Sequence, residues 1–269
     1  MSAAPAGRPE ASALPERKEY RIGCAEIWGG VALVDSDVCT RGLSATVYSR
    51  AADGEKGGDI YYFSVCSADQ LTRVALADLR GHGEQVSVLS QWLYQALEQR
   101  MNTLDGAGVL GELNTQVRTH GFAAMTTAAV VSYYTGNSQL YFSYAGHTPL
   151  LLRRSQGGWK AMPVEGQGSG PANLPLGVIA GVRYDQAQAT LEPGDRFFLC
   201  TDGVEECPNP AGEFFGEERL AEFLESHADL PLPEIKACLL ERLAEHAGGP
   251  LEHDDCTFMI VEVRDIKSR

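Results

Sequence analysis

The sequence lacks the cysteine pattern of a disulfide-stabilised or zinc-binding protein. Its 7 cysteines are odd in number and scattered, and no CxxC pair occurs. Small domains that depend on disulfides carry an even number of cysteines, and structural zinc sites need paired Cys or His ligands. We therefore expect reduced thiols, with neither a disulfide framework nor a zinc ribbon.

The chain also lacks long apolar runs and a surplus of basic residues. No window approaches the ~18 apolar residues that a membrane-spanning helix needs, and the first residues contain no apolar signal segment. Lys and Arg total 22 against 36 Asp and Glu, a formal net charge of −14. An acidic surface repels phosphate backbones and anionic lipid. The sequence therefore predicts a cytoplasmic protein without a nucleic-acid or membrane partner.

The remaining composition is that of a globular protein, with 269 residues of which 44% are hydrophobic. Residues 1–19 are rich in Ala, Pro and Ser and show no apolar periodicity, so we predict a disordered N-terminal tail. From residue 20 to residue 269, strand and helix patterns follow one another without a linker-like break. We therefore predict a single domain over 20–269.

Apolar periodicity places secondary structure along this domain. Residues 59–65 and 71–78 are rich in β-forming side chains and are separated by a short loop, which predicts a hairpin. Residues 84–101 carry apolar side chains at helical spacing. The other predicted elements are helices over 109–117, 217–224 and 232–247, an antiparallel meander of strands over 126–134, 139–144 and 150–153, a loop over 157–174, a hairpin of strands over 184–191 and 196–201, and a last strand over 257–263. Hairpins grouped with helix pairs favour an α+β fold with antiparallel sheets.

Four acidic clusters fall where predicted strands meet turns. They are GGD ending at Asp59, DLRGHG beginning at Asp78, TDG around Asp202, and HDD, which contains Asp254 and Asp255. A single Asp-Gly pair is common turn chemistry. If the four clusters converge to ~5 Å, each pair of carboxylates repels by about 3 kcal/mol at an effective dielectric of ~20. Such a site requires cations.

The ligand chemistry of these clusters favours two hard divalent ions. Carboxylate oxygens without Cys or paired His select Mg²⁺ or Mn²⁺ over zinc. Two such ions would offset four carboxylate charges, hold a phosphate dianion in an acidic protein, and activate a water between them as a nucleophile. The residues therefore point to phosphomonoester hydrolysis.

Seven ordered motifs resemble those of the metal-dependent PPM (protein phosphatase type 2C) family in its bacterial SpoIIE-like, RsbU-like branch. They are GGDIYYF, ALADLRGHG, YAGHTPLLLRR, LPLGV, LEPGDRFFLCTDGVEE, GEFFGEERL and HDDCTFMIV. The resemblance implies a sandwich of two antiparallel β-sheets flanked by helix pairs, in agreement with the predicted elements. It also implies action on phosphoserine or phosphothreonine in proteins, often small antagonists of anti-sigma factors.

The resemblance assigns the metal ligands residue by residue. It implies Asp59 for one ion, Asp78 as the ligand that bridges both with the backbone carbonyl of Leu79 beside it, and Asp202 with Asp254 for the other ion. A water bound between the two ions would attack the phosphate. Asp255 is the alternative to Asp254. His82 could act as a general acid and Arg80 as a phosphate clamp, but we prefer a turn residue for His82 and a solvated side chain for Arg80.

The sequence thus predicts a Ser/Thr phosphoprotein phosphatase, dependent on two Mn²⁺ or Mg²⁺ ions and active in regulatory signalling. Two alternatives stay open. One is a catalytically silent module that binds a phosphoprotein, and the other is an enzyme that hydrolyses small phosphomonoesters. The identity of the phosphorylated partner, the oligomeric state and a third metal have no readable signal in the residues.

Overall fold

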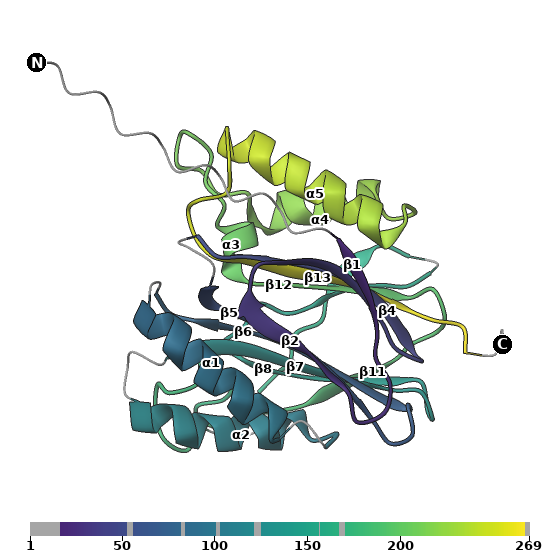
Figure 1. Cartoon of the computed structure of the whole chain (residues 1–269), viewed down its shortest axis with the longest axis vertical. Helices are drawn as coiled ribbons and strands as arrows, with labels where there is room; N and C mark the ends of the chain where they lie inside the picture. The colour runs from purple at the N-terminus through teal and green to yellow at the C-terminus, as the bar shows by residue number, and fades with distance from the viewer. Residues whose placement is uncertain are drawn as a thin grey trace, which may run out of the picture.

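Two β-sheets stack face to face and carry helices on both outer faces (Figure 1). The computed structural model describes residues 17–52, 56–81, 84–100, 103–120, 125–155, 157–166 and 170–266. The seven-stranded sheet has the order β1 (Lys18–Arg21), β3 (Val34–Cys39), β4 (Leu43–Arg50), β13 (Cys256–Val263), β12 (Arg196–Cys200), β9 (Leu151–Arg153) and β10 (Trp159–Ala161). The six-stranded sheet has the order β11 (Ala187–Thr190), β8 (Gln139–Ala145), β7 (Thr126–Tyr134), β6 (Leu71–Leu79), β5 (Lys56–Cys66) and β2 (Ile27–Ala32).

Helix pairs cover the two outer faces. The helices are α1 (Glu84–Glu98) and α2 (Gly106–Val117), followed by a short turn of 3₁₀ helix over Arg118–His120, and then α3 (Asp202–Glu205), α4 (Gly216–Ser226) and α5 (Leu232–Ala247). Helices α1 and α2 lie on the six-stranded sheet, and α4 and α5 lie on the seven-stranded sheet (Figure 1). Of the described helices, none is long and apolar enough to cross a membrane.

The predicted fold class is confirmed. Every pairing between these strands is antiparallel, apart from β1 with β3. Successive residues of a strand face opposite sides of a sheet, so each central strand serves two cores. On β6, Val74 and Leu76 join the core between the sheets, whereas Ala75 and Ala77 pack under α1 and α2. A third core lies between the seven-stranded sheet and α3, α4 and α5.

The predicted hairpin over residues 184–201 is wrong. Its two strands, β11 and β12, belong to different sheets, because β11 pairs with β8 and β12 pairs with β13 and β9. The turn between them carries Asp195, a buried carboxylate that accepts hydrogen bonds from the N–H of Glu192 (2.9 Å) and from the N–H of Ser155 (2.8 Å). These bonds tie the turn to the β9–β10 loop and make it a crossing between sheets.

The predicted meander is correct for its first two strands and wrong for the third. Strand β7 pairs with β8, but β9 lies in the other sheet between β12 and β10. The chain leaves the six-stranded sheet at Gly146, whose φ of +64° lies in the left-handed region. Leu150 is then fixed by its N–H, which donates to the Tyr144 hydroxyl at 3.1 Å. Turn residues mark where a strand ends, but they do not state which sheet the next strand joins.

Two further differences from expectation concern the predicted tail and the predicted loop, while α1, α2 and α4 differ from their predicted bounds by up to three residues. Strand β1 begins at Lys18, inside the predicted tail of residues 1–19, because its backbone pairs in parallel with β3 from Ser36 to Cys39. Residues 1–16 lie outside the described ranges. The predicted loop over 157–174 contains the short strand β10, which is held to α4 by the Trp159 indole N–H donating to the Leu224 carbonyl at 3.0 Å.

Candidate active site

The first two acids of the candidate site end neighbouring strands of the six-stranded sheet. The β5–β6 ladder pairs Ile60 with Ala77, and one more step in this register places Asp59 opposite Asp78. Both positions alternate with residues that pack under the helices, so both carboxylates face the space between the two sheets. The sequence could not show this convergence, because it depends on strand register.

Asp59 is the most deeply buried of these acids, with 3% of its surface exposed. Its Oδ2 accepts a hydrogen bond from the Thr201 hydroxyl at 2.8 Å, which links the two sheets. Its Oδ1 is buried and has no hydrogen-bond partner among the described residues. Burial, with the nearby Asp78 charge second, raises the pKa of Asp59 well above its usual value. A buried carboxylate with an unsatisfied oxygen is a natural ligand for a cation.

Asp78 lies nearer to solvent than Asp59. Its carboxylate is close enough to Asp202 and Asp254, which flank strands of the seven-stranded sheet, to feel their charge. Burial raises its pKa to about 7, and the negative charges of Asp202 and Asp254 contribute next. Asp202 is the first residue of α3, directly after β12. Desolvation and the charge of Asp254 also raise the pKa of Asp202. Three of the predicted acids therefore share one electrostatic environment with Asp59.

Asp254 and Asp255 have different environments. Asp255 is buried, and its Oδ1 and Oδ2 accept hydrogen bonds from the backbone N–H groups of Ala52 (2.8 Å) and Gly58. A Cβ atom at Gly57 would lie 2.0 Å from the Asp255 Oδ2, so this close approach requires glycine. Asp254 is exposed, and its Oδ1 accepts the N–H of Asp255 at 2.8 Å. The structure thus favours Asp254 as the residue available to a ligand and gives Asp255 a role in joining β4 to β5.

The Leu79 carbonyl lies beside Gly58 at the end of β6. A Cβ atom at Gly58 would lie 2.5 Å from that oxygen, so glycine keeps the space next to it open. The N–H of Gly58 donates to Asp255, beyond the end of the β5–β6 ladder at Ile60. This arrangement is compatible with the predicted use of the carbonyl as a ligand.

The structure does not test the roles predicted for Arg80 and His82 in contacting the substrate. Arg80 has an exposed side chain, and its backbone N–H donates to the Met125 carbonyl at 3.1 Å. His82 lies outside the described residues. Both assignments stay predictions.

Several residues that sequence reasoning passed over hold the acids in place. The Thr201 hydroxyl, which donates to Asp59, also accepts the N–H of Thr257 at 3.1 Å. The His253 Nε2 lies 2.8 Å from the Gly203 carbonyl and ties the loop of Asp254 to the start of α3. Thr201 and His253 are the first residues of the TDG and HDD motifs, and nothing else in the sequence marks their role.

The donor chemistry of the cluster fits hard divalent cations. It offers carboxylate oxygens, one of them orphaned and buried, and an open space beside a backbone carbonyl, with no sulfur ligand required. Within the described ranges, no three acidic, His or Cys side chains are grouped closely enough to hold an ion as they stand. The cluster is therefore defined by electrostatics and register, and its ligand set stays a prediction.

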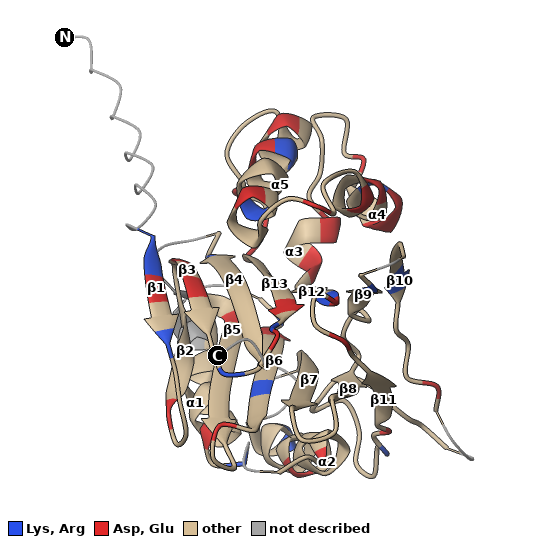
Figure 2. Cartoon of the chain, turned by 90° about the vertical axis from the view of Figure 1, so that its right-hand side faces the viewer, with Lys and Arg blue, Asp and Glu red and all other residues tan. Residues whose placement is uncertain are grey.

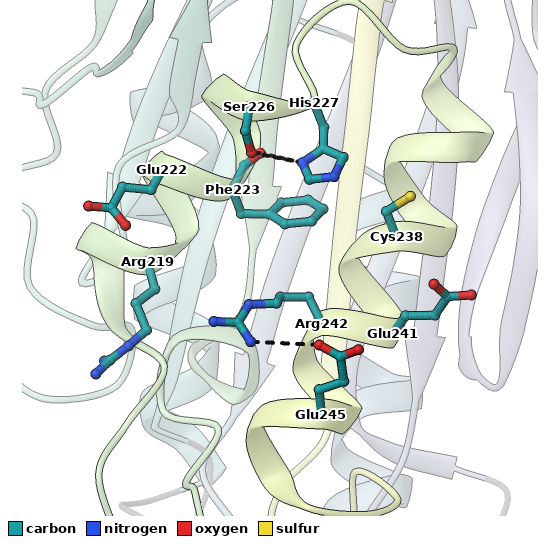
Figure 3. Close-up of a pocket in the computed structure, with 9 residues that line it drawn as sticks. All are labelled: Arg219, Glu222, Phe223, Ser226, His227, Cys238, Glu241, Arg242 and Glu245. Atoms are coloured by element: carbon teal, nitrogen blue, oxygen red, sulfur yellow. Dashed lines mark hydrogen bonds and ion pairs between the residues drawn. The ribbon is translucent and has the colours of Figure 1, made fainter.

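A separate groove of about 620 Å³ lies between α4 and α5. Figure 3 shows Arg219 and Glu222 of α4 on one side and Arg242 and Glu245 of α5 on the other, with Arg242 and Glu245 joined as an ion pair. None of the acids at the strand ends lines this groove.

In Figure 2 the acidic residues of α3 and α4 stand out in red.

Comparison with known proteins agrees with this geometry. The family described as Stage II sporulation protein E (SpoIIE) matches residues 68–264. The phosphoserine phosphatase RsbU of Bacillus subtilis is 27% identical over 77% of this chain and 59% of its own length. Among solved structures, the SiaA-PP2C domain of Pseudomonas aeruginosa has a TM-score of 0.70 and 24% identity over 82% of this chain and 86% of that one. RsbX in complex with magnesium has a TM-score of 0.64 and 17% identity over 86% and 100%.

The two-sheet sandwich is the fold of solved PP2C phosphatase domains. The chain belongs to the SpoIIE family. It spans between 33% and 59% of the length of the curated relatives it matches.

The raised pKa of Asp78 predicts a pH-dependent stability in metal-free protein. Between its ordinary value near 4 and its folded value of about 7, the folded state keeps a proton that the unfolded chain has released. The free energy of unfolding should therefore fall as pH rises through this window, and Asp78→Asn should reduce that fall by on the order of 2–4 kcal/mol. Urea denaturation in EDTA across the window measures it, with the exposed Glu222→Gln as control. Equal slopes for wild type and Asp78→Asn would contradict the prediction.

Substitution of Asp255 should affect mainly stability, whereas substitution of Asp254 should affect mainly Mn²⁺ binding. Asp255→Asn replaces one acceptor with a donor that faces a backbone N–H, so it should lower the free energy of unfolding in EDTA by about 2 kcal/mol. Asp254→Asn should leave that value within about 0.5 kcal/mol of wild type and weaken Mn²⁺ binding by about tenfold or more. Denaturation curves and calorimetric Mn²⁺ titrations compare them. The reverse pattern would identify Asp255 as the ligand.

Proposed function

We propose that the chain is a metal-dependent protein phosphatase that hydrolyses phosphoserine or phosphothreonine. The observation that carries the proposal is the pair Asp59 and Asp78, placed by register between the sheets with one Asp59 oxygen buried and unsatisfied. Family membership supports the proposal, as does the activity named for RsbU. The structure of RsbX with magnesium supports a divalent cation in this fold.

The proposed ligands follow the sequence-based assignment. Asp78 would be the ligand shared by both ions, with the Leu79 carbonyl beside it, Asp59 would bind one ion, and Asp202 with Asp254 would bind the other. When bound, two Mn²⁺ or Mg²⁺ ions supply the positive charge that attracts a phosphate dianion and the Lewis acidity that activates water.

The protein's own part is to hold the carboxylates before any cation arrives. The Thr201 hydroxyl orients Asp59 across the gap between the sheets, and the His253 contact with the Gly203 carbonyl keeps the start of α3 near the loop of Asp254. Such preorganisation reduces the rearrangement needed when ligand binds. Burial first, and neighbouring negative charge second, raise the pKa of Asp59 and Asp78, and a bound cation would offset both costs of ionisation.

The substrate we propose is a phosphorylated regulatory protein, for which an anti-sigma factor antagonist is the leading candidate. This proposal comes from the family resemblance and from RsbU, a phosphoserine phosphatase by name. A cytoplasmic location remains a prediction from the sequence. The silent binding module and the small-molecule phosphomonoesterase are the outcomes against which the proposal is tested.

The first test is metal dependence. Purified protein should hydrolyse p-nitrophenyl phosphate and phosphoserine peptides with Mn²⁺ or Mg²⁺ and lose this activity in EDTA, because uncompensated carboxylates repel a phosphate dianion. A phosphorylated protein should be preferred over the small substrate in kcat/KM. Full activity in excess EDTA would overturn the metal mechanism, no turnover with any cation would favour the binding module, and preference for small esters would favour the phosphomonoesterase.

A second test ranks the acids. Asp78→Asn should lower turnover more than Asp59→Asn, because a ligand of one ion is bypassed by raising the metal concentration, whereas the shared ligand of both is not. Asp202→Asn should behave like Asp59→Asn. Mn²⁺ titrations of turnover compare the variants. Rescue of Asp78→Asn by metal as readily as Asp59→Asn would show that Asp78 is not the bridge.

A further inference from the structure

Asn114 is a buried polar residue on the otherwise apolar inner face of α2. Its exposed fraction is 3%. The other buried residues of this helix are Gly106, Val109, Leu110, Leu113 and Val117. Burying an amide is costly unless its donor and acceptor are both satisfied, so the partners of Asn114 identify what it does.

Both ends of the Asn114 amide bind one loop, the segment of residues 174–179. The Nδ2 donates to the Ile179 carbonyl at 3.1 Å, and the Oδ1 accepts the N–H of Gly177 at 2.8 Å. Gly177 has a φ of +88°, a left-handed conformation that glycine adopts without strain. The side chain therefore clamps a turn of defined shape.

The clamped loop extends the sheet beside the candidate site. The Leu176 N–H donates to the Thr126 carbonyl at 2.8 Å, and the Thr126 N–H donates to the Leu176 carbonyl at 3.2 Å. Thr126 is the register partner of Leu79, and Thr127 is the partner of Asp78. A single strand end thus separates the loop from the proposed ligands on β6.

A second side of the loop rests on the end of β8. The Gly146 N–H donates to the Asn173 carbonyl at 2.7 Å. A Cβ atom at Gly146 would lie 2.3 Å from the Pro175 Cγ, so the two backbones are in close contact. With β7 and β8 on two sides, the Asn114 amide supplies the attachment of the loop to α2.

We propose that Asn114 is a positioning residue for the cation site. Its amide holds the 174–179 loop against Thr126 and thereby keeps the end of β6, with Asp78 and the Leu79 carbonyl, in the arrangement that binds divalent cations. The proposal rests on the proposed function. It requires that loss of the clamp weakens cation binding more than a general loss of stability does.

The test compares variants in direct Mn²⁺ binding, measured by calorimetry and by the electron paramagnetic resonance signal of free Mn²⁺. Asn114→Leu keeps the volume and removes both hydrogen bonds, and it should weaken Mn²⁺ binding by about fivefold to tenfold. Turnover should recover at saturating Mn²⁺. Gly177→Ala strains the same turn from the loop side and should produce the same shift while Asn114 is intact.

Val109→Ala is the matched control. Val109 is buried on the same helix and in the same core, so its truncation should lower the melting temperature in EDTA while Mn²⁺ binding stays within about twofold of wild type. An equal loss of Mn²⁺ binding in Val109→Ala would reduce the effect to stability and overturn the proposal.

Two further outcomes separate this inference from the proposed function. If wild type binds Mn²⁺ and both folded variants, Asn114→Leu and Gly177→Ala, bind it equally well, the positioning role is wrong and the metal site stands. If wild type itself binds no Mn²⁺, the proposed function fails and the inference fails with it.

Discussion

The structure depends on holding negative charge where proteins normally exclude it, at the strand ends between two packed sheets. Asp59 and Asp78 meet there because their strands pair in one register, and Asp59 is bonded to Thr201 of the opposite sheet. An uncompensated pair of this kind costs stability. The fold must therefore be rigid enough to keep the acids together, and under the proposed function a bound cation would offset their repulsion.

The surrounding packing supplies that rigidity. Three apolar cores, one between the sheets and one under each helix layer, use alternate residues of the same strands. Asp59 on β5 and Asp78 on β6 lie at the strand ends, on the side that faces the other sheet, where the apolar core ends. Glycines remove the side chains that would block the approach, as at Gly203, where a Cβ atom would lie 1.9 Å from the Asp255 carbonyl oxygen. Among these acids Asp59 and Asp255 stay buried with the core, whereas Asp254 is exposed to solvent.

Much of the secondary structure could be predicted from the sequence because its signals are local. Strand β7 and helix α5 have the predicted bounds, since a run of β-branched residues and a 3.6-residue apolar period depend only on neighbouring residues. The assignment of β9 and β12 to the other sheet could not be predicted. Their turns, around Gly146 and Asp195, have the composition of hairpin turns, and their direction is set by distant backbone partners.

The sequence by itself determined where the four acidic clusters lie and the order of the motifs that contain them, since both are visible without coordinates. It also determined the excess of acidic over basic residues, from which the need for a cation is predicted. Only the tertiary structure decided that Asp255 is occupied by backbone N–H groups while Asp254 faces solvent, and that Asn114 on α2 reaches the loop beside Thr126. These distinctions depend on hydrogen bonds between residues far apart in the chain, and such partners exist only once the two sheets and the helices have packed.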